Sequence, residues 1–215
     1  MALPMGLTCS ARIFTRVALF VGSRLRRSGV RLVMYIDDLL VIASSSELCE
    51  EHVALVLEEL AKFGFLLNEK KSCLSPSSSF TYLGFVWNTE SWQVSVKTDR
   101  EDKIRKNARE LLTCSEASCR SVSAFLGRTG STVGAIPLAR ARVRTLQWEF
   151  LSTCVTPDMY DTFMEVSNEA KEELRFWADL EPGLSLPITL GESQGTVTTD
   201  ASEEGLGIWY DGYVI

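Results

Sequence analysis

Residues 30–43 read Val30-Arg31-Leu32-Val33-Met34-Tyr35-Ile36-Asp37-Asp38-Leu39-Leu40-Val41-Ile42-Ala43. Two apolar runs of strand length flank the adjacent aspartates, which predicts a β-hairpin with the aspartates at its turn. Neighbouring carboxylates repel each other, so a pair that stays ionised indicates either a bound cation or an open turn in water. Aspartate is also a common turn residue, and this alternative needs no metal and no chemistry.

The composition is that of a globular protein. Of the 215 residues, 46% are hydrophobic, which is enough to bury a core in one large or two small domains. The longest apolar stretch near the start, residues 17–21, is short and lies next to Arg16 and Arg24, which argues against a membrane span or a secretory signal. We therefore expect a cytoplasmic or nuclear protein. The six cysteines form no Cys-x-x-Cys pair, so reduced thiols are expected and a zinc site is not.

The net charge of −6 conceals a strong segregation along the chain. Residues 1–31 carry six arginines and no acid, whereas residues 32–94 carry three basic and nine acidic side chains. Residues 95–150 carry eleven basic and six acidic side chains, and residues 151–215 carry two and thirteen. Basic segments around an acidic block suit a protein that holds phosphates with cations and a metal with carboxylates. Charge runs are also common on ordinary solvated helices.

Hydrophobic periodicity predicts several helices. The first covers about residues 8–27 and is expected to bury Ile13, Val17 and Phe20. The second begins at a capping box formed by Ser44 and Glu47 and ends at Gly64. From residue 97 onward the pattern is mainly helical. A helix over residues 158–180 is expected to bury four residues of its apolar face: Phe163, Ala170, Leu174 and Trp177.

Strands are expected at residues 65–67 and 80–87. The second strand is interrupted at Gly84, where a glycine permits a bulge or the close approach of another backbone.

The order of short motifs resembles the reverse transcriptase family. Leu3-Pro4-Met5-Gly6, followed by Ser10 and Phe14, resembles the family's Leu-Pro-x-Gly block, although Cys9-Ser10-Ala11 replaces the more usual Ser-Pro. Residues 35–38 resemble the Tyr-x-Asp-Asp box. Residues 64–68 with Lys71 resemble the Gly-Phe-x-x-Asn…Lys block, and residues 82–85 resemble the hairpin that grips the primer strand. The shared order, over residues 3–87, is more specific than any single motif.

This resemblance implies a role for each matching residue. Asp37 and Asp38 would bind catalytic Mg²⁺, and Lys71 would assist the leaving pyrophosphate. The nucleotide-binding residues would be Pro4, Met5, Gly6 and Tyr35. The primer-binding residues would be Tyr82, Leu83, Gly84 and Phe85. The implied partners are an RNA or DNA template-primer, dNTPs and the remaining parts of a retroelement polyprotein, with no membrane.

The expected fold class is α+β. Residues 1–95 would form part of a polymerase palm, an antiparallel sheet with helices on one face, and residues 96–180 a mainly helical thumb or connection region. Residues 181–195 are rich in proline and glycine and predict a linker. Residues 196–215 resemble the first hairpin of a ribonuclease H, in which Asp200 would bind a metal. The combination is similar to retrotransposons of the tyrosine-recombinase type.

The resemblance also predicts an incomplete active site. The family's palm takes another aspartate from an earlier strand, and that strand should precede Leu3. The sequence therefore predicts a fragment of an RNA-directed DNA polymerase that is inactive by itself. The alternative is a non-catalytic remnant that binds nucleic acid or protein through five arginines: Arg120, Arg128, Arg140, Arg142 and Arg144.

Overall fold

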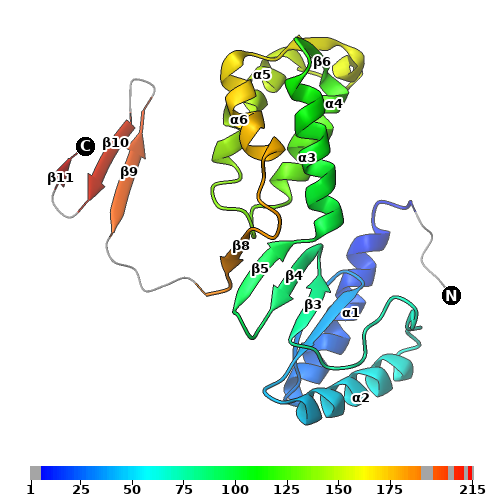
Figure 1. Cartoon of the computed structure of the whole chain (residues 1–215). Helices are drawn as coiled ribbons and strands as arrows, with labels where there is room; N and C mark the ends of the chain where they lie inside the picture. Colours follow the sequence, from blue (N-terminus) through cyan, green and yellow to red (C-terminus); the bar gives the residue numbers. More distant parts are fainter. Residues whose placement is uncertain (1–5, 190–195, 203–205, 211–212, 215) are drawn as a thin grey trace.

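The computed structural model describes residues 6–189, 196–202, 206–210 and 213–214. Within these ranges the chain has an α+β fold with several small antiparallel sheets, which agrees with the expected fold class. Figure 1 shows three parts: a helix-backed hairpin near the N-terminus, a helical region that stands on a four-stranded sheet, and a small C-terminal sheet.

The predicted aspartate hairpin is confirmed. Strands β1 (Arg31–Tyr35) and β2 (Asp38–Ile42) pair antiparallel, with Leu32 opposite Val41 and Tyr35 opposite Asp38. Helices α1 (Ser10–Arg27) and α2 (Ser46–Lys62) both cover the same face of this hairpin. The small core between helices and strands contains Val21, Leu25, Val30, Leu32 and Val56.

Helix α1 buries a different face from the one that its large apolar residues predicted. Ile13, Val17 and Phe20 are exposed, and the buried residues are Ala18, Val21, Gly22 and Leu25. The reason is the close approach of strand β1, since a side chain at Gly22 would overlap the sulfur of Met34. Small residues are needed on the face that contacts the strand, so the larger ones point outward.

Two local predictions near α2 are wrong. The N-cap is Ser45 rather than Ser44, and its hydroxyl accepts a hydrogen bond from the backbone N–H of Leu48 at 3.2 Å. The expected strand over residues 65–67 is a loop. Phe65 of this loop packs its ring edge-on against Phe14 of α1 and joins the small core, so side-chain packing rather than strand pairing holds the segment.

A second sheet has the strand order β3-β4-β5-β8. Strands β3 (Ser79–Tyr82) and β4 (Phe85–Asn88) form a hairpin around Leu83 and Gly84, and β5 (Gln93–Val96) follows. The expected single strand over residues 80–87 is therefore two strands with a turn at Gly84. Strand β8 (Ser185–Pro187) pairs with β5. The predicted linker thus contains a strand that joins this sheet.

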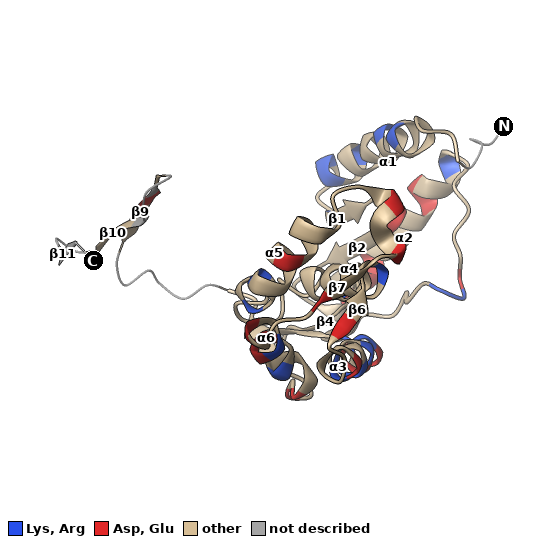
Figure 2. Ribbon diagram, turned by 90° about the horizontal axis from the view of Figure 1, so that it is seen from above, with Lys and Arg blue, Asp and Glu red and all other residues tan. Residues whose placement is uncertain are grey.

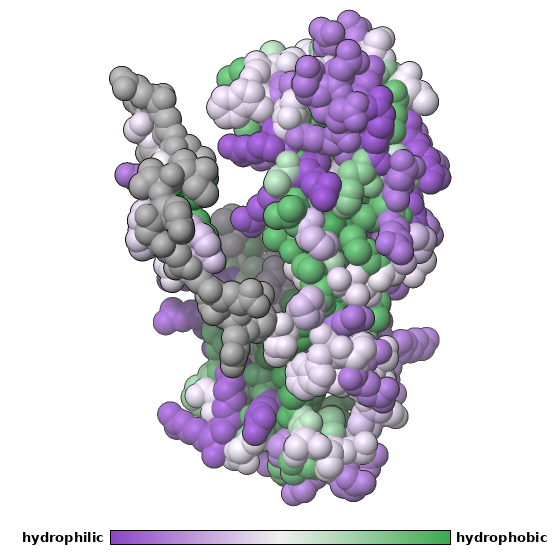
Figure 3. Space-filling model, turned by 60° about the vertical axis from the view of Figure 1, so that its left-hand side comes forward, coloured by the Kyte–Doolittle hydropathy of each residue, from purple (hydrophilic) through white to green (hydrophobic). Residues whose placement is uncertain are grey.

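The helical region holds the larger core. It comprises α3 (Thr98–Leu112), α4 (Cys119–Gly130), α5 (Arg144–Thr153) and α6 (Asn168–Ala178), with the short strands β6 (Glu116–Ser118) and β7 (Phe163–Glu165) and the 3₁₀ turns η1 (Ala141–Val143) and η2 (Pro157–Asp161). Its centre includes Ile104, Phe125 and Trp177, and the last two meet edge to face. In Figure 3 the top of the molecule is mostly hydrophilic, and hydrophobic side chains gather below it.

The helix predicted over residues 158–180 is shorter than expected. Ala170, Leu174 and Trp177 are buried on α6 as predicted, but Phe163 lies in β7 and is 67% exposed. Two residues cause the difference: Pro157 begins a 3₁₀ turn, and Ser167 caps α6 by accepting a hydrogen bond from Ala170 N.

The C-terminal segment forms a sheet of β9 (Val197–Ala201), β10 (Leu206–Tyr210) and β11 (Tyr213–Val214). A hairpin was predicted here, and β9 and β10 form one. Figures 1 and 2 both show this sheet to one side of the other parts. Among the residues described, no helix has the length and apolar character required to cross a bilayer.

Candidate functional site

The turn between β1 and β2 presents the two aspartates. Ile36 and Asp37 form the two-residue loop, and Asp38 begins β2 opposite Tyr35. Ile36 has φ +53°, a left-handed conformation that β-branched residues rarely adopt and that costs about 1–3 kcal/mol. Asp37, Asp38 and Tyr35 are all exposed. The strained loop therefore holds two adjacent carboxylates where a cation could reach them.

The β3–β4 hairpin contributes Tyr82 to the neighbourhood of this turn. Burial raises the pKa of the Tyr82 hydroxyl above its ordinary value, and the negative charge of Asp38 raises it further. This hydroxyl has no hydrogen-bond partner among the described residues. The charge at the aspartate turn therefore acts on a part-buried hydroxyl of the second hairpin.

Gly84 allows an arginine to approach the second turn. Leu83 and Gly84 have φ values of +52° and +81°, and a Cβ atom on Gly84 would lie 2.6 Å from Nη1 of Arg100. The predicted close approach at this glycine is therefore made by a side chain from α3. Nothing in the sequence singled out Arg100, because its position depends on how α3 meets the hairpin.

Two further residues implied by the resemblance, Lys71 and Gly6, lie in turns. Lys71 is exposed, and its N–H donates to the carbonyl of Asn68 at 3.0 Å in a tight turn. Gly6 lies in a turn with φ +84°, and nothing lies within 4 Å of the position of a Cβ atom there. Pro4 and Met5 lie outside the described residues. Phe85 begins β4 and packs edge-on against Trp87.

Asp200 is not part of this site. It lies in β9 opposite Gly207, and Figures 1 and 2 show β9 away from the β1–β2 hairpin. The structure therefore does not bring Asp200 together with Asp37 and Asp38.

The donor chemistry of the aspartate turn fits Mg²⁺. Magnesium takes oxygen ligands and is commonly held by one or two carboxylates together with substrate phosphates and water. Asp37 and Asp38 supply the carboxylates. Across the part of the chain that the structure describes, no group of three or more His, Cys, Asp or Glu side chains could hold a metal. A complete two-metal centre would need a further ligand from outside the described residues.

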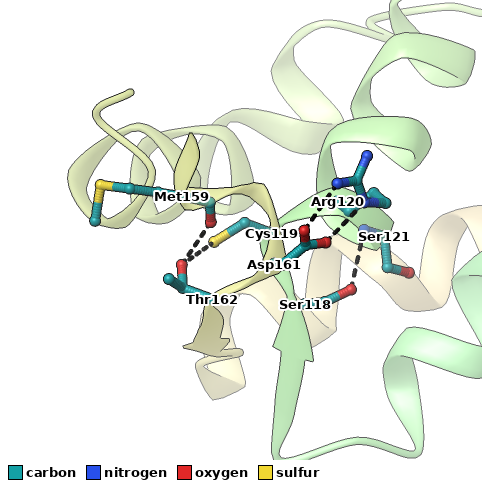
Figure 4. A network of polar contacts seen from close by, with 7 residues as sticks. All are labelled: Ser118, Cys119, Arg120, Ser121, Met159, Asp161 and Thr162. Atoms are coloured by element: carbon teal, nitrogen blue, oxygen red, sulfur yellow. Dashed lines mark hydrogen bonds and ion pairs between the residues drawn. The ribbon is translucent and has the colours of Figure 1, made fainter. Parts of the chain in front are cut away.

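Four of the five arginines that the sequence suggested for nucleic-acid binding are engaged within the protein. Figure 4 shows Arg120 paired with both carboxylate oxygens of Asp161, at 2.9 and 3.1 Å, and this pairing holds the pKa of Asp161 below its ordinary value. Arg128 donates to Asn107, Arg142 stacks on Phe176 at 3.9 Å, and Arg144 donates to Gln147. Arg140 is exposed and has no side-chain partner in the described ranges.

The family comparison fits this geometry. Residues 1–87, which include both hairpin turns, match the family model for the reverse transcriptase (RNA-dependent DNA polymerase). Residues 1–87 therefore match part of a reverse transcriptase domain.

Two solved structures extend the likeness in fold beyond this domain. A foamy viral protease-reverse transcriptase in complex with double-stranded DNA has a TM-score of 0.66 and 19% identity, and another in complex with an RNA/DNA hybrid has 0.68 and 18%. Each alignment covers 99% of this chain, which spans only 34% and 26% of those two chains. No curated protein sequence matches the chain. At this identity the likeness shows the fold of part of a reverse transcriptase.

Proposed function

We propose that the chain is part of the RNA-directed DNA polymerase of a retrotransposon, with Asp37 and Asp38 as metal ligands. The observation that carries this proposal is the strained β1–β2 turn, which exposes two adjacent carboxylates within the residues that match the family model. A generic aspartate turn has no need of a left-handed isoleucine, since Gly or Asn would form the same loop without strain.

Each part of the site has a distinct task in nucleotidyl transfer. Asp37 and Asp38 would hold Mg²⁺, and the bound ion would supply activation of the primer 3′-hydroxyl and charge neutralisation at the pyrophosphate. The β3–β4 turn positions the primer end, and Arg100 supplies positive charge for its phosphates. Lys71 stabilises the leaving pyrophosphate. The turn at Gly6 lets the backbone approach the incoming dNTP. We assign the start of a ribonuclease H, with Asp200 as a metal ligand, to residues 196–215.

Metal binding tests the assignment of the aspartates. The wild-type chain with a template-primer duplex should bind Mg²⁺ in a calorimetric titration, and Asp37→Asn should weaken binding by about tenfold or more, because a charged ligand is replaced by a neutral one. Glu69→Gln removes an exposed acid elsewhere and should leave binding unchanged. Equal Mg²⁺ affinities for the wild type and Asp37→Asn would show that Asp37 is a turn residue and not a metal ligand.

Primer extension gives a separate test. We expect no extension of a DNA primer on an RNA template by this chain alone, since the described residues place no third carboxylate at the turn. Loss of one bridging ligand removes several kcal/mol of transition-state stabilisation, which corresponds to a rate reduced by about 10³-fold. Robust incorporation of dNTPs would contradict this expectation.

Nucleic-acid binding without catalysis is the second candidate function, and the unpaired Arg140 favours it. We expect the chain to bind an RNA/DNA hybrid at low salt and to lose affinity steeply as salt increases, because each phosphate contact releases counterions. Arg140→Ala should reduce the slope of log K against log salt by about one. Arg120→Ala should change the slope less, because Arg120 is held by Asp161. Absence of binding at low ionic strength would exclude this function.

A further inference from the structure

The outer face of α1 is basic and partly apolar. Helix α1 carries five arginines and no acidic residue. Arg12, Arg16 and Arg27 are exposed. Large apolar side chains are exposed between them, including Val17 and Phe20, the latter with 57% of its surface accessible. A helix of this composition that faced only water would expose its apolar residues at a cost.

The outer face of α2 has the same spacing and the opposite charge. Helix α2 carries five glutamates and one lysine. Glu47, Glu51 and Leu55 follow one another at four-residue intervals, as Arg12, Arg16 and Phe20 do on α1, so each set forms a stripe along its helix. All six residues are exposed. One stripe is therefore positive and the other negative, and each ends in a large apolar side chain.

Several of these charges are not satisfied within the chain. Arg24 pairs with Glu59, Lys62 pairs with Glu58, and Arg26 donates to the carbonyl of Leu32. In contrast, Arg12, Arg16 and Arg27 on α1, and Glu50 and Glu51 on α2, form no ion pair with any residue that the structure describes. The unpaired arginines and glutamates thus lie on neighbouring helices and remain available to a partner.

The two stripes belong to one surface. Both helices pack on the same face of the β1–β2 hairpin, so both outer faces point away from it. Figure 2 shows this division of charge, with blue residues on α1 and mainly red residues on α2. Between the helices lies a hollow of about 430 Å³. Its lining comes from the C-terminal end of α1 (Arg24, Leu25, Arg27 and Ser28) and from α2 (Leu55, Glu58, Glu59 and Lys62). The surface therefore has a basic half, an acidic half and a recess between them.

We propose that this surface, formed by the outer faces of α1 and α2, binds a second copy of the same chain. A two-fold axis in the plane of the interface, along the boundary between the helices, would place α1 of each copy on α2 of the other. Both sets of unpaired charges are then satisfied, and the apolar residues of both stripes are covered. A polyanion such as nucleic acid or an acidic membrane would pair with the arginines of α1 but would be repelled by the glutamates of α2. It would therefore leave the charges of α2 without partners.

Sedimentation of the full chain tests the proposal. The wild type should form a dimer as concentration increases, and the dimer should weaken at high salt because the pairs at its rim are screened. Arg12→Glu/Arg16→Glu should weaken the dimer and raise its dissociation constant at least tenfold, because acidic α1 would face acidic α2. Glu50→Arg/Glu51→Arg should have the same effect through repulsion of two basic helices.

Mixing the two variants makes the test specific. A heterodimer of Arg12→Glu/Arg16→Glu with Glu50→Arg/Glu51→Arg brings opposite charges together at both contacts, so two differently labelled monomeric variants should associate when mixed. Lys103→Glu/Arg109→Glu reverses two exposed charges on α3 and should dimerise as the wild type does. Asp37→Asn should also dimerise normally, which separates this proposal from the polymerase assignment.

Three outcomes would overturn the proposal. The first is a wild type that stays monomeric at all concentrations at low salt. The second is a dimer that survives both charge reversals. The third is a pair of reversed variants that do not associate with each other. If the wild type is monomeric and the α1 variant alone loses affinity for nucleic acid, the arginines of α1 serve a polyanion instead.

Discussion

Glu101 carries a carboxyl group that is almost wholly inside the protein. Only 1% of the residue is exposed, although it lies in the first turn of α3. One carboxylate oxygen accepts a hydrogen bond from Gly183 N at 3.3 Å and lies 3.8 Å from Arg105, and the other has no partner among the described residues. Burial raises the pKa of Glu101, and the hydrogen bond from Gly183 and the charge of Arg105 only partly offset this effect.

The raised pKa of Glu101 predicts how stability depends on pH. The native state holds the proton more tightly than the unfolded state, so the free energy of unfolding should fall as pH rises from the ordinary value of 4.5 through the raised pKa. Glu101→Gln removes this titration and should flatten the dependence in denaturant titrations carried from pH 4.5 upward. Glu50→Gln, a change at an exposed glutamate of α2, should keep the wild-type slope. Equal slopes for Glu101→Gln and the wild type would refute this explanation.

For single residues, the sequence predicts the position of a side chain when that position depends on residues nearby in the chain. The hairpin around Asp37 and Asp38 follows from the pattern of the flanking residues. The positions of Arg100 and Glu101 do not, because they depend on contacts with Gly84 and Gly183 made when α3 meets the sheet and the β8 segment. No periodicity or motif within α3 contains that information.

Helix α1 shows why the buried face of a helix is harder to predict than the bounds of the helix. The extent of α1 was predicted to within about two residues, which is the usual uncertainty of helix ends, but its buried face was not. Helix α1 has two apolar stripes, one of large residues and one that includes Ala18 and Gly22. Periodicity finds both stripes, and the close contact of Gly22 with Met34 decides which of them is buried.

The N-terminus of α2 allows a direct comparison of two adjacent serines. Ser45→Ala should lower the free energy of unfolding by about 1 kcal/mol, because the hydroxyl that accepts from Leu48 N is lost. Ser44→Ala, the position favoured by sequence spacing, should change it by less than about 0.5 kcal/mol. Urea denaturation of both variants gives the measurement. A larger effect at Ser44 than at Ser45 would contradict the observed cap.

At the scale of the whole molecule, the described residues form two separate cores of unequal size. The core of the helical region includes 22 buried residues, whereas the core between the β1–β2 hairpin and its helices includes five. Since local stability follows buried apolar contact, amide protons of α3 and α6 should exchange with solvent more slowly than those of α1 and α2.

Hydrogen exchange can test this difference under chosen conditions. The measurement should be made at low protein concentration and high salt, because dimer formation through α1 and α2 would otherwise protect their amide protons from exchange. Equal protection in both regions would show that the two cores unfold as one unit.

The late position of strand β8 in the sequence affects how the sheet forms during synthesis. Strand β8 completes the sheet by pairing with β5, yet roughly ninety residues separate the end of β5 from its start. At a synthesis rate of about 5–20 residues per second, the edge of β5 stays unpaired for roughly 5–20 seconds before β8 is synthesised. During that time its backbone groups are open to strands of other nascent chains. Chaperones that bind exposed strand edges should therefore associate with this protein mainly during translation of the helical region.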